Sequence, residues 1–212
     1  MSNTSAETIC AEVLNSSNRV QESDRPAHDW YRFVLAFPPH LVRHYVSSFG
    51  LHPGDTLLDP FCGTGTTIVE GKKLGLKTIG LEPSPMARFA AETKADWTVD
   101  GAQLLSHARL IAARTATSLK KRGNDLLTLP TEQYNLLLKG SISPLPLHKS
   151  LALLHEIETC AEERFRKYES LAVAKILVNG VGNLHFGPEI GVSNPKTDAD
   201  VIAQWLTEVE SI

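Results

Sequence analysis

A glycine-containing loop between two short apolar segments constrains the fold of this chain more than any other feature. The segment DTLLD at residues 55–59 has the length and composition of a buried strand. It leads through the loop PFCGTGT at 60–66 into a helical pattern at 67–74. A second strand-like segment, KTIGLE, spans residues 77–82, and a proline-rich turn then opens a helical pattern at 83–91. This order predicts a βαβα unit whose two strands pair in parallel.

The rest of the chain carries helical patterns rather than strand patterns. Upstream of the loop, Pro38-Pro39 interrupts an apolar periodicity, so a helix is expected only from about residue 40 to residue 49. Downstream, Asp100 is a typical N-cap residue and Gly123 a typical helix end. Further helices are expected at residues 102–122, 131–140, 147–165, 168–178 and 200–212. No strand is expected beyond residue 82, so the predicted fold class is α/β, with a partial sheet and a large helical extension.

Composition divides the chain into three regions. Hydrophobic residues make up 42% of the 212 residues, which indicates a globular protein. We expect a polar N-terminal arm at 1–26, a βαβα unit at 27–100 and a helical region at 101–212. The net charge of -3 does not by itself indicate a nucleic-acid binder. Residues 101–150, however, hold seven Lys or Arg and two Asp or Glu, whereas residues 151–212 hold five and ten.

Several other classes of protein find no support in the residue pattern. The three cysteines, Cys10, Cys62 and Cys160, are far apart, which argues against a zinc site or a disulfide framework and favours a reducing cytoplasm. The eight histidines are scattered, so no metal site is predicted. The first residues lack the basic and apolar runs of a signal peptide, and no apolar stretch of about 18 residues predicts a membrane span.

The loop and the end of the second strand indicate a nucleotide-like ligand. Ligands of this class bind at the carboxyl ends of parallel strands, where glycines allow a close approach of the backbone. Glu82 follows the glycines by about 20 residues, which is where a carboxylate binds ribose hydroxyls. The loop lacks both the third glycine of a dinucleotide fingerprint and the lysine of a phosphate-binding loop. The acidic Asp59 suits a cationic ligand without phosphate, and S-adenosylmethionine fits this description.

The segment DPFCGTGTT at 59–67 resembles the cofactor loop of the amino-methylating DNA methyltransferases. The upstream FPPHL at 37–41 resembles the motif that precedes this loop in permuted members of the class. The stretches at 142–149 and 183–189 resemble a bacterial DNA methylase subfamily with a helical insertion. The resemblance implies a partial Rossmann-like methyltransferase sheet, S-adenosylmethionine as cofactor, and DNA as partner, methylated on N4 of cytosine or N6 of adenine.

The resemblance also implies which residues surround the cofactor. The loop would bind its methionine part, Glu82 its ribose and Pro83 its adenine edge, while the upstream motif would close over it. The implied cofactor-binding residues are Phe37, Pro38, Asp59, Pro60, Phe61, Gly63, Thr64, Gly65, Thr66, Thr67, Glu82 and Pro83.

The chain departs from the family at the catalytic loop, so its catalytic residues stay unknown. In the family, an Asp, Asn or Ser precedes two prolines and an aromatic residue, and this loop holds the target base. Neither Pro38-Pro39 nor Ser143-Pro144-Leu145-Pro146 has the required neighbours. We therefore expect the chain alone to be inactive, and a second polypeptide or a downstream segment to supply the catalytic loop.

Three alternatives to these interpretations stay open. An RNA guanine methyltransferase has a similar loop, and a non-catalytic subunit would explain the missing catalytic loop. Cys62 is more easily explained as a packing residue than as a nucleophile. The run Lys120-Lys121-Arg122 suits DNA phosphates, but cations also stabilise a helix C-terminus.

Overall fold

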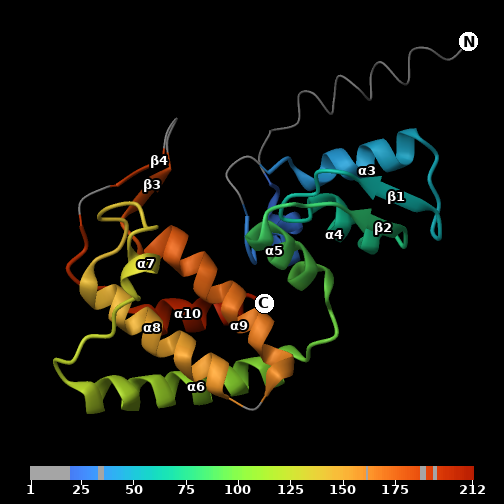
Figure 1. Cartoon of the computed structure of the whole chain (residues 1–212). Helices are drawn as coiled ribbons and strands as arrows, with labels where there is room; N and C mark the ends of the chain where they lie inside the picture. Colours follow the sequence, from blue (N-terminus) through green and yellow to red (C-terminus); the bar gives the residue numbers. More distant parts are fainter. Residues whose placement is uncertain (1–19, 33–35, 161, 187–189, 193–194) are drawn as a thin grey trace, which may run out of the picture. The chain divides into compact units, whose positions relative to one another are not determined.

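The computed structural model describes residues 20–32, 36–160, 162–186, 190–192 and 195–212. The chain is an α/β protein that divides into two compact units, one up to Trp97 and one from Thr98 (Figure 1). Each unit has its own buried residues and is described by itself.

The first unit contains the predicted parallel pair of strands. Its elements are η1 (Glu22–Asp24), α2 (Arg25–His28), α3 (Pro39–Ser48), β1 (Thr56–Asp59), α4 (Thr66–Lys73), β2 (Lys77–Gly80) and α5 (Pro85–Ala95). Strands β1 and β2 pair in parallel, with Leu57 opposite Thr78 and Leu58 opposite Ile79. The predicted order of strand, loop, helix, strand and helix is therefore confirmed.

One face of the β1–β2 pair is covered by helices. Leu57 points to this face and packs against a buried cluster in which Val42 and Val46 come from α3 and Leu76 precedes β2. Thr78 points to the same face, where its side chain lies against Gly71 of α4. Leu57 and Thr78 are thus half-buried while their chain neighbours Leu58 and Ile79 are exposed, as expected for strands with one covered face.

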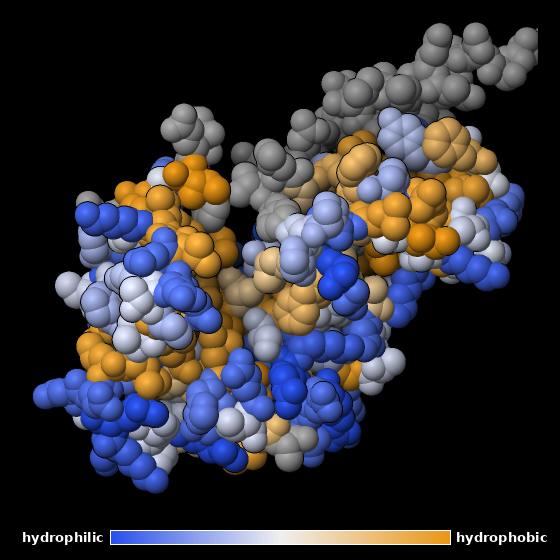
Figure 2. All heavy atoms as spheres, viewed as in Figure 1, coloured by the Kyte–Doolittle hydropathy of each residue, from blue (hydrophilic) through white to orange (hydrophobic). Residues whose placement is uncertain are grey.

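The opposite face of the β1–β2 pair is apolar and exposed. Leu58 and Ile79 are cross-strand partners on this face, and their exposed fractions are 57% and 51%. Leu81, just beyond β2, is exposed as well. Figure 2 shows hydrophobic residues gathered where Figure 1 places the two strands. Because parallel sheets occur almost only with both faces covered, this face is one on which another segment or chain can pack.

The second unit is mainly helical. Its elements are α6 (Gly101–Arg122), α7 (Thr131–Tyr134), α8 (Pro144–Thr159), α9 (Glu163–Ile176), η2 (Leu177–Val181), β3 (Leu184–Phe186), β4 (Ile190–Val192) and α10 (Val201–Glu210). The predicted N-cap of α6 is confirmed, because the Asp100 carboxylate accepts a hydrogen bond of 2.9 Å from the Gln103 amide. Asp200 caps α10 in the same way, through the Ala203 amide.

Three expectations for the second unit are wrong. The helix expected at 131–140 ends at Tyr134, and turns follow it. The helix expected at 147–165 is two helices, because α8 ends at Thr159, the Cys160 backbone is extended, and α9 begins at Glu163. Strands also occur beyond residue 82, since β3 and β4 form an antiparallel pair.

No described helix combines the length and the apolar character that crossing a membrane requires.

Candidate functional site

The candidate site is the loop that joins β1 to α4 in the first unit. The Asp59 carboxylate, at the end of β1, accepts a hydrogen bond of 3.0 Å from the Phe61 amide. The Cys62 amide donates to the carbonyl of Leu81 beyond β2, at 3.1 Å. The loop is thereby fastened to the carboxyl ends of both strands, where ligands of open parallel sheets bind.

Gly65 makes the tight turn into α4 possible. Its backbone is left-handed, with φ of +87°, and a Cβ at this position would lie 2.9 Å from the Cβ of Ala91 in α5. Any other residue would therefore strain the backbone and collide with α5. The loop depends on this glycine both for its conformation and for its approach to the neighbouring helix.

Cys62 is a packing residue of the loop. Its side chain is buried, and its Sγ would lie 2.7 Å from a Cβ placed on Gly80 of β2. Burial raises the pKa of the Cys62 thiol, and the charges of Asp59 and Glu82 raise it further. These surroundings disfavour the thiolate that a nucleophile requires, so the packing interpretation is supported.

Glu82 is joined directly to the glycine loop. One carboxylate oxygen, Oε2, accepts a hydrogen bond of 2.9 Å from the Gly63 amide, and the other, Oε1, accepts one of 2.8 Å from the Ser84 amide. Glu82 is half-buried and Pro83 is exposed. The two segments that the sequence assigned to one site therefore meet in the structure.

The remaining predicted residues lie within the loop, at the start of α4, or in the segment before α3. Thr64, Thr66 and Thr67 are buried, whereas the Phe61 side chain is 82% exposed. Phe37 and Thr67 both line an apolar cavity of about 300 Å³ beside α3. The upstream motif thus lies next to the start of α4, and its buried Pro38 precedes α3 directly.

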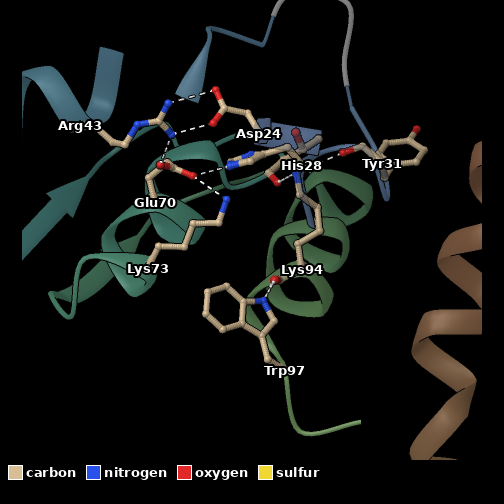
Figure 3. Close-up of polar contacts among 9 residues, drawn as sticks. Asp24, His28, Tyr31, Arg43, Glu70, Lys73, Lys94 and Trp97 are labelled. Carbon is tan, nitrogen blue, oxygen red and sulfur yellow. Dashed lines mark hydrogen bonds and ion pairs between the residues drawn. The ribbon is translucent and has the colours of Figure 1, made fainter. Parts of the chain in front are cut away.

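Lys94 of α5 binds the backbone of the loop, and this role was not predicted from the sequence. This lysine is fully buried, and its Nζ donates to the carbonyl of Thr64 at 2.7 Å and to that of Tyr31 at 3.1 Å (Figure 3). The loop and the segment that follows α2 are therefore held by one side chain. A signal was present, because Lys94 continues at helical spacing the buried stripe of Ala87, Ala90 and Ala91.

The pKa of Lys94 is far below that of an exposed lysine. Burial and, to a smaller extent, the positive charge of Arg32 lower the pKa of Lys94 to about 7, while Asp29 opposes this shift. A positive charge at Lys94 therefore costs folding free energy at neutral pH. Above pH 7 the folded protein releases a proton that the unfolded chain keeps until about pH 10.5.

We predict that Lys94 makes the stability of the first unit rise with pH. Between pH 7 and pH 9.5 the unfolded state binds more protons than the folded state, so the free energy of unfolding increases. In Lys94→Met, which keeps the side-chain length but does not titrate, this increase should be lost. Urea unfolding of both proteins at the two pH values checks it, and an equal increase in the variant would contradict it.

A second buried network joins Glu70 of α4 to three basic side chains (Figure 3). The Glu70 carboxylate contacts His28 at 2.7 Å, Arg43 at 2.6 Å and Lys73 at 2.9 Å. Arg43 also pairs with Asp24 at 2.9 Å, which ties the end of the predicted N-terminal arm to α3. This network was not predicted, because glutamate is a residue type that is normally exposed to solvent.

The pKa of Glu70 shows which effect dominates in this network. Burial alone would raise the pKa of Glu70, but the hydrogen bonds from His28, Lys73 and Arg43 outweigh it and lower the pKa to about 2. Burial lowers the pKa of His28, although its contact with Glu70 acts in the opposite direction. Glu70 is therefore a buried anion that stabilises the packing of α2 and α3 on α4.

Among the described residues, no group of three or more His, Cys, Asp or Glu side chains is arranged to hold a metal ion. The run Lys120-Lys121-Arg122 ends α6, where positive charges favour the helix dipole, and Arg122 pairs with Asp125 at 3.7 Å.

Comparison with known proteins finds similarities in the first unit. A family model described as DNA methylase, of the N6 and N4 type, matches residues 7–91. The type II methyltransferase M.BsoBI of Geobacillus stearothermophilus is 43% identical over 67 residues, which are 32% of this chain and 13% of that protein. Residues 7–91 of this chain are therefore similar to the DNA methylases. This matched segment contains the glycine loop, Glu70 and Glu82 described above.

Other relatives match between about a quarter and a third of the chain. The type II methyltransferase M.MjaII of Methanocaldococcus jannaschii is 32% identical over 74 residues, or 35% of this chain and 14% of that protein. The tRNA (guanine(10)-N2)-dimethyltransferase of Methanothermobacter thermautotrophicus is 41% identical over 58 residues, or 27% and 17%. The matched segments thus cover less than a fifth of these curated relatives. No solved structure matches the chain.

Proposed function

We propose that this chain is the cofactor-binding part of an S-adenosylmethionine-dependent DNA methyltransferase that acts on an exocyclic amino group. The observation that carries the proposal is the contact between the Glu82 carboxylate and the Gly63 amide, which builds one site from the ends of β1 and β2. The match of residues 7–91 to the DNA methylases supports the same reaction. In this proposal, the parallel β1–β2 pair is the beginning of a Rossmann-like sheet.

The residues at the loop fit this cofactor. Asp59 supplies negative charge for its ammonium and sulfonium groups, and Glu82 offers its carboxylate to the ribose hydroxyls. The start of α4 at Thr66 supplies backbone amides for the carboxylate of the cofactor. Around Gly63 the space is open, because a Cβ there would meet no atom within 4 Å. S-adenosylmethionine supplies an electrophilic methyl group, and the protein contributes position and electrostatics.

The exposed apolar face of the β1–β2 pair suits the same proposal. Leu58, Ile79 and Leu81 offer a surface on which a further segment or a second polypeptide can complete the sheet. The described residues contain no loop of the catalytic type, so that additional part would also bring the residues that hold the target base.

The similarity to tRNA guanine dimethyltransferases supports a second candidate function. Both candidates use the same cofactor site, so cofactor binding does not separate them. Transfer of a labelled methyl group to duplex DNA or to tRNA, measured with the assembled enzyme, separates them directly.

We predict that Gly63→Val and Glu82→Ala each weaken binding of S-adenosylmethionine at least tenfold, or roughly 1.4 kcal/mol. The valine would fill the open space above the loop, and the alanine would remove the ribose acceptor. Isothermal titration calorimetry with cofactor and with its demethylated product measures the effect.

Gly50→Val is the matched control for the loop variant. Gly50 also has a left-handed backbone, with φ of +64° against +51° at Gly63, and open space around it. Gly50 precedes β1, whereas the loop follows β1. Gly50→Val therefore strains the backbone to a similar degree, but at a position outside the loop. Folded wild-type protein that binds no cofactor at millimolar concentration would refute the proposed function.

A further inference from the structure

A cysteine, a histidine and a glutamate form a connected row in the second unit. Sγ of Cys160 lies 3.1 Å from Nε2 of His107, and Nδ1 of the same ring lies 2.7 Å from Oε1 of Glu169. The three residues come from the end of α8, from α6 and from α9. All three residues lie outside the segment 7–91 that matches the DNA methylases, so they are not part of the site described above.

The surroundings fix the histidine and the glutamate but leave the cysteine partly exposed. His107 is 8% exposed and packs against the ring of Phe165, with 4.9 Å between the ring centroids. Glu169 is fully buried, and Trp205 donates to its backbone carbonyl at 3.0 Å. Cys160, in contrast, is partly exposed. A reagent in solution can therefore reach the thiol, while its two partners stay in place.

The glutamate holds the histidine ring through Nδ1. Burial raises the pKa of Glu169, and the contact with His107 counteracts this effect. The second oxygen of Glu169, Oε2, is buried without a hydrogen-bond partner among the described residues. A buried carboxylate in this state is stabilised when the neighbouring imidazole gains a proton. The Cys160 thiol is in position to provide that proton.

We propose that Cys160 is a nucleophilic thiol, activated by His107 and Glu169, and a site of covalent modification by soft carbon electrophiles. Nucleophile, base and orienting carboxylate stand in the order that activated cysteines use. In the reaction, the thiol proton moves to Nε2 of His107 while Nδ1–H donates to Glu169. The sulfur then forms a bond to the carbon of the electrophile, and the leaving group departs with its bonding electrons.

Alkylation by iodoacetamide tests this proposal without any reference to methyl transfer. Mass spectrometry of the folded full chain at pH 6.5 gives the rate at each cysteine separately. A peptide of residues 154–165 gives the rate of the same cysteine without its partners. We expect Cys160 of the folded chain to react at least tenfold faster than the peptide, and Cys62 to react more slowly than Cys160.

Two substitutions distinguish activation of the Cys160 thiol by His107 from simple exposure of Cys160 to solvent. His107→Gln should reduce the rate at Cys160 at least tenfold. His155→Gln, which changes an exposed histidine of the same helix α8, should leave the rate unchanged. A folded wild-type chain whose Cys160 reacts no faster than the peptide would overturn the proposal. This comparison needs no variant, so it holds even where a substitution disturbs folding.

Discussion

Replacing Glu70 with glutamine is expected to destabilise the first unit by about 3 kcal/mol at pH 7. The magnitude follows from the pKa of Glu70, which falls from 4.5 to about 2 on folding, at about 1.4 kcal/mol per pKa unit. The substitution also leaves the buried His28 and the cations of Arg43 and Lys73 without their common anion. Urea unfolding followed by circular dichroism measures the loss.

The pH dependence of the free energy of unfolding tests whether the charge of Glu70 causes this loss of stability. A carboxylate whose folded pKa is lowered contributes stability that is complete above about pH 4.5 and is lost as the pH falls towards 2. The wild-type protein should therefore lose stability over this interval more steeply than Glu70→Gln. Glu92→Gln changes an exposed carboxylate of α5, which pairs with Arg88 only at 3.8 Å, and should cost less than about 0.5 kcal/mol. Equal acid sensitivity of wild type and Glu70→Gln would refute this assignment.

Methyl transfer by the purified 212-residue chain is expected to stay at background, even where it binds S-adenosylmethionine. A methyl acceptor must be held with its nitrogen about 3 Å from the reacting carbon, and a misplaced acceptor loses orders of magnitude in rate. None of the described segments has the loop that holds the acceptor in the resembled family. Incorporation of labelled methyl groups into duplex DNA measures the activity, with M.BsoBI as the positive control.

The same preparation should be tested for cofactor binding, because only a chain that binds and does not turn over supports this interpretation. Clear turnover would contradict it and would direct attention to the segment Phe37-Pro38-Pro39-His40, where the consecutive prolines lie beside the loop. Activity that appears only after addition of a polypeptide with the missing loop would support completion of the sheet by a second part.

Local signals in the sequence were sufficient for the βαβα unit. The turn at Gly65 and the cap at Asp100 follow from the chemistry of single residues and their immediate neighbours. The meeting of Glu82 with the loop follows from parallel pairing, which brings the carboxyl ends of both strands together. These features needed no knowledge of distant contacts.

The features that were missed depend on contacts between distant residues. Lys94 and Glu70 are charged residues, which are normally solvated, and only the three-dimensional packing shows that partners compensate their burial. The break between α8 and α9 contains neither proline nor glycine, so the helical pattern continued through it in the sequence. Strands β3 and β4 are three residues each, too short for an alternating pattern to be recognised.

The shared anion of Glu70 has a consequence for how this segment evolves. His28, Arg43 and Lys73 come from three parts of the chain, yet the side chains of all three contact the same carboxylate. A neutral residue at position 70 is therefore tolerable only after its basic partners have changed. Among homologues, positions 28, 43, 70 and 73 should vary together, and the order in which substitutions accumulate there should be restricted. A lineage that loses the glutamate first would pass through an unstable intermediate.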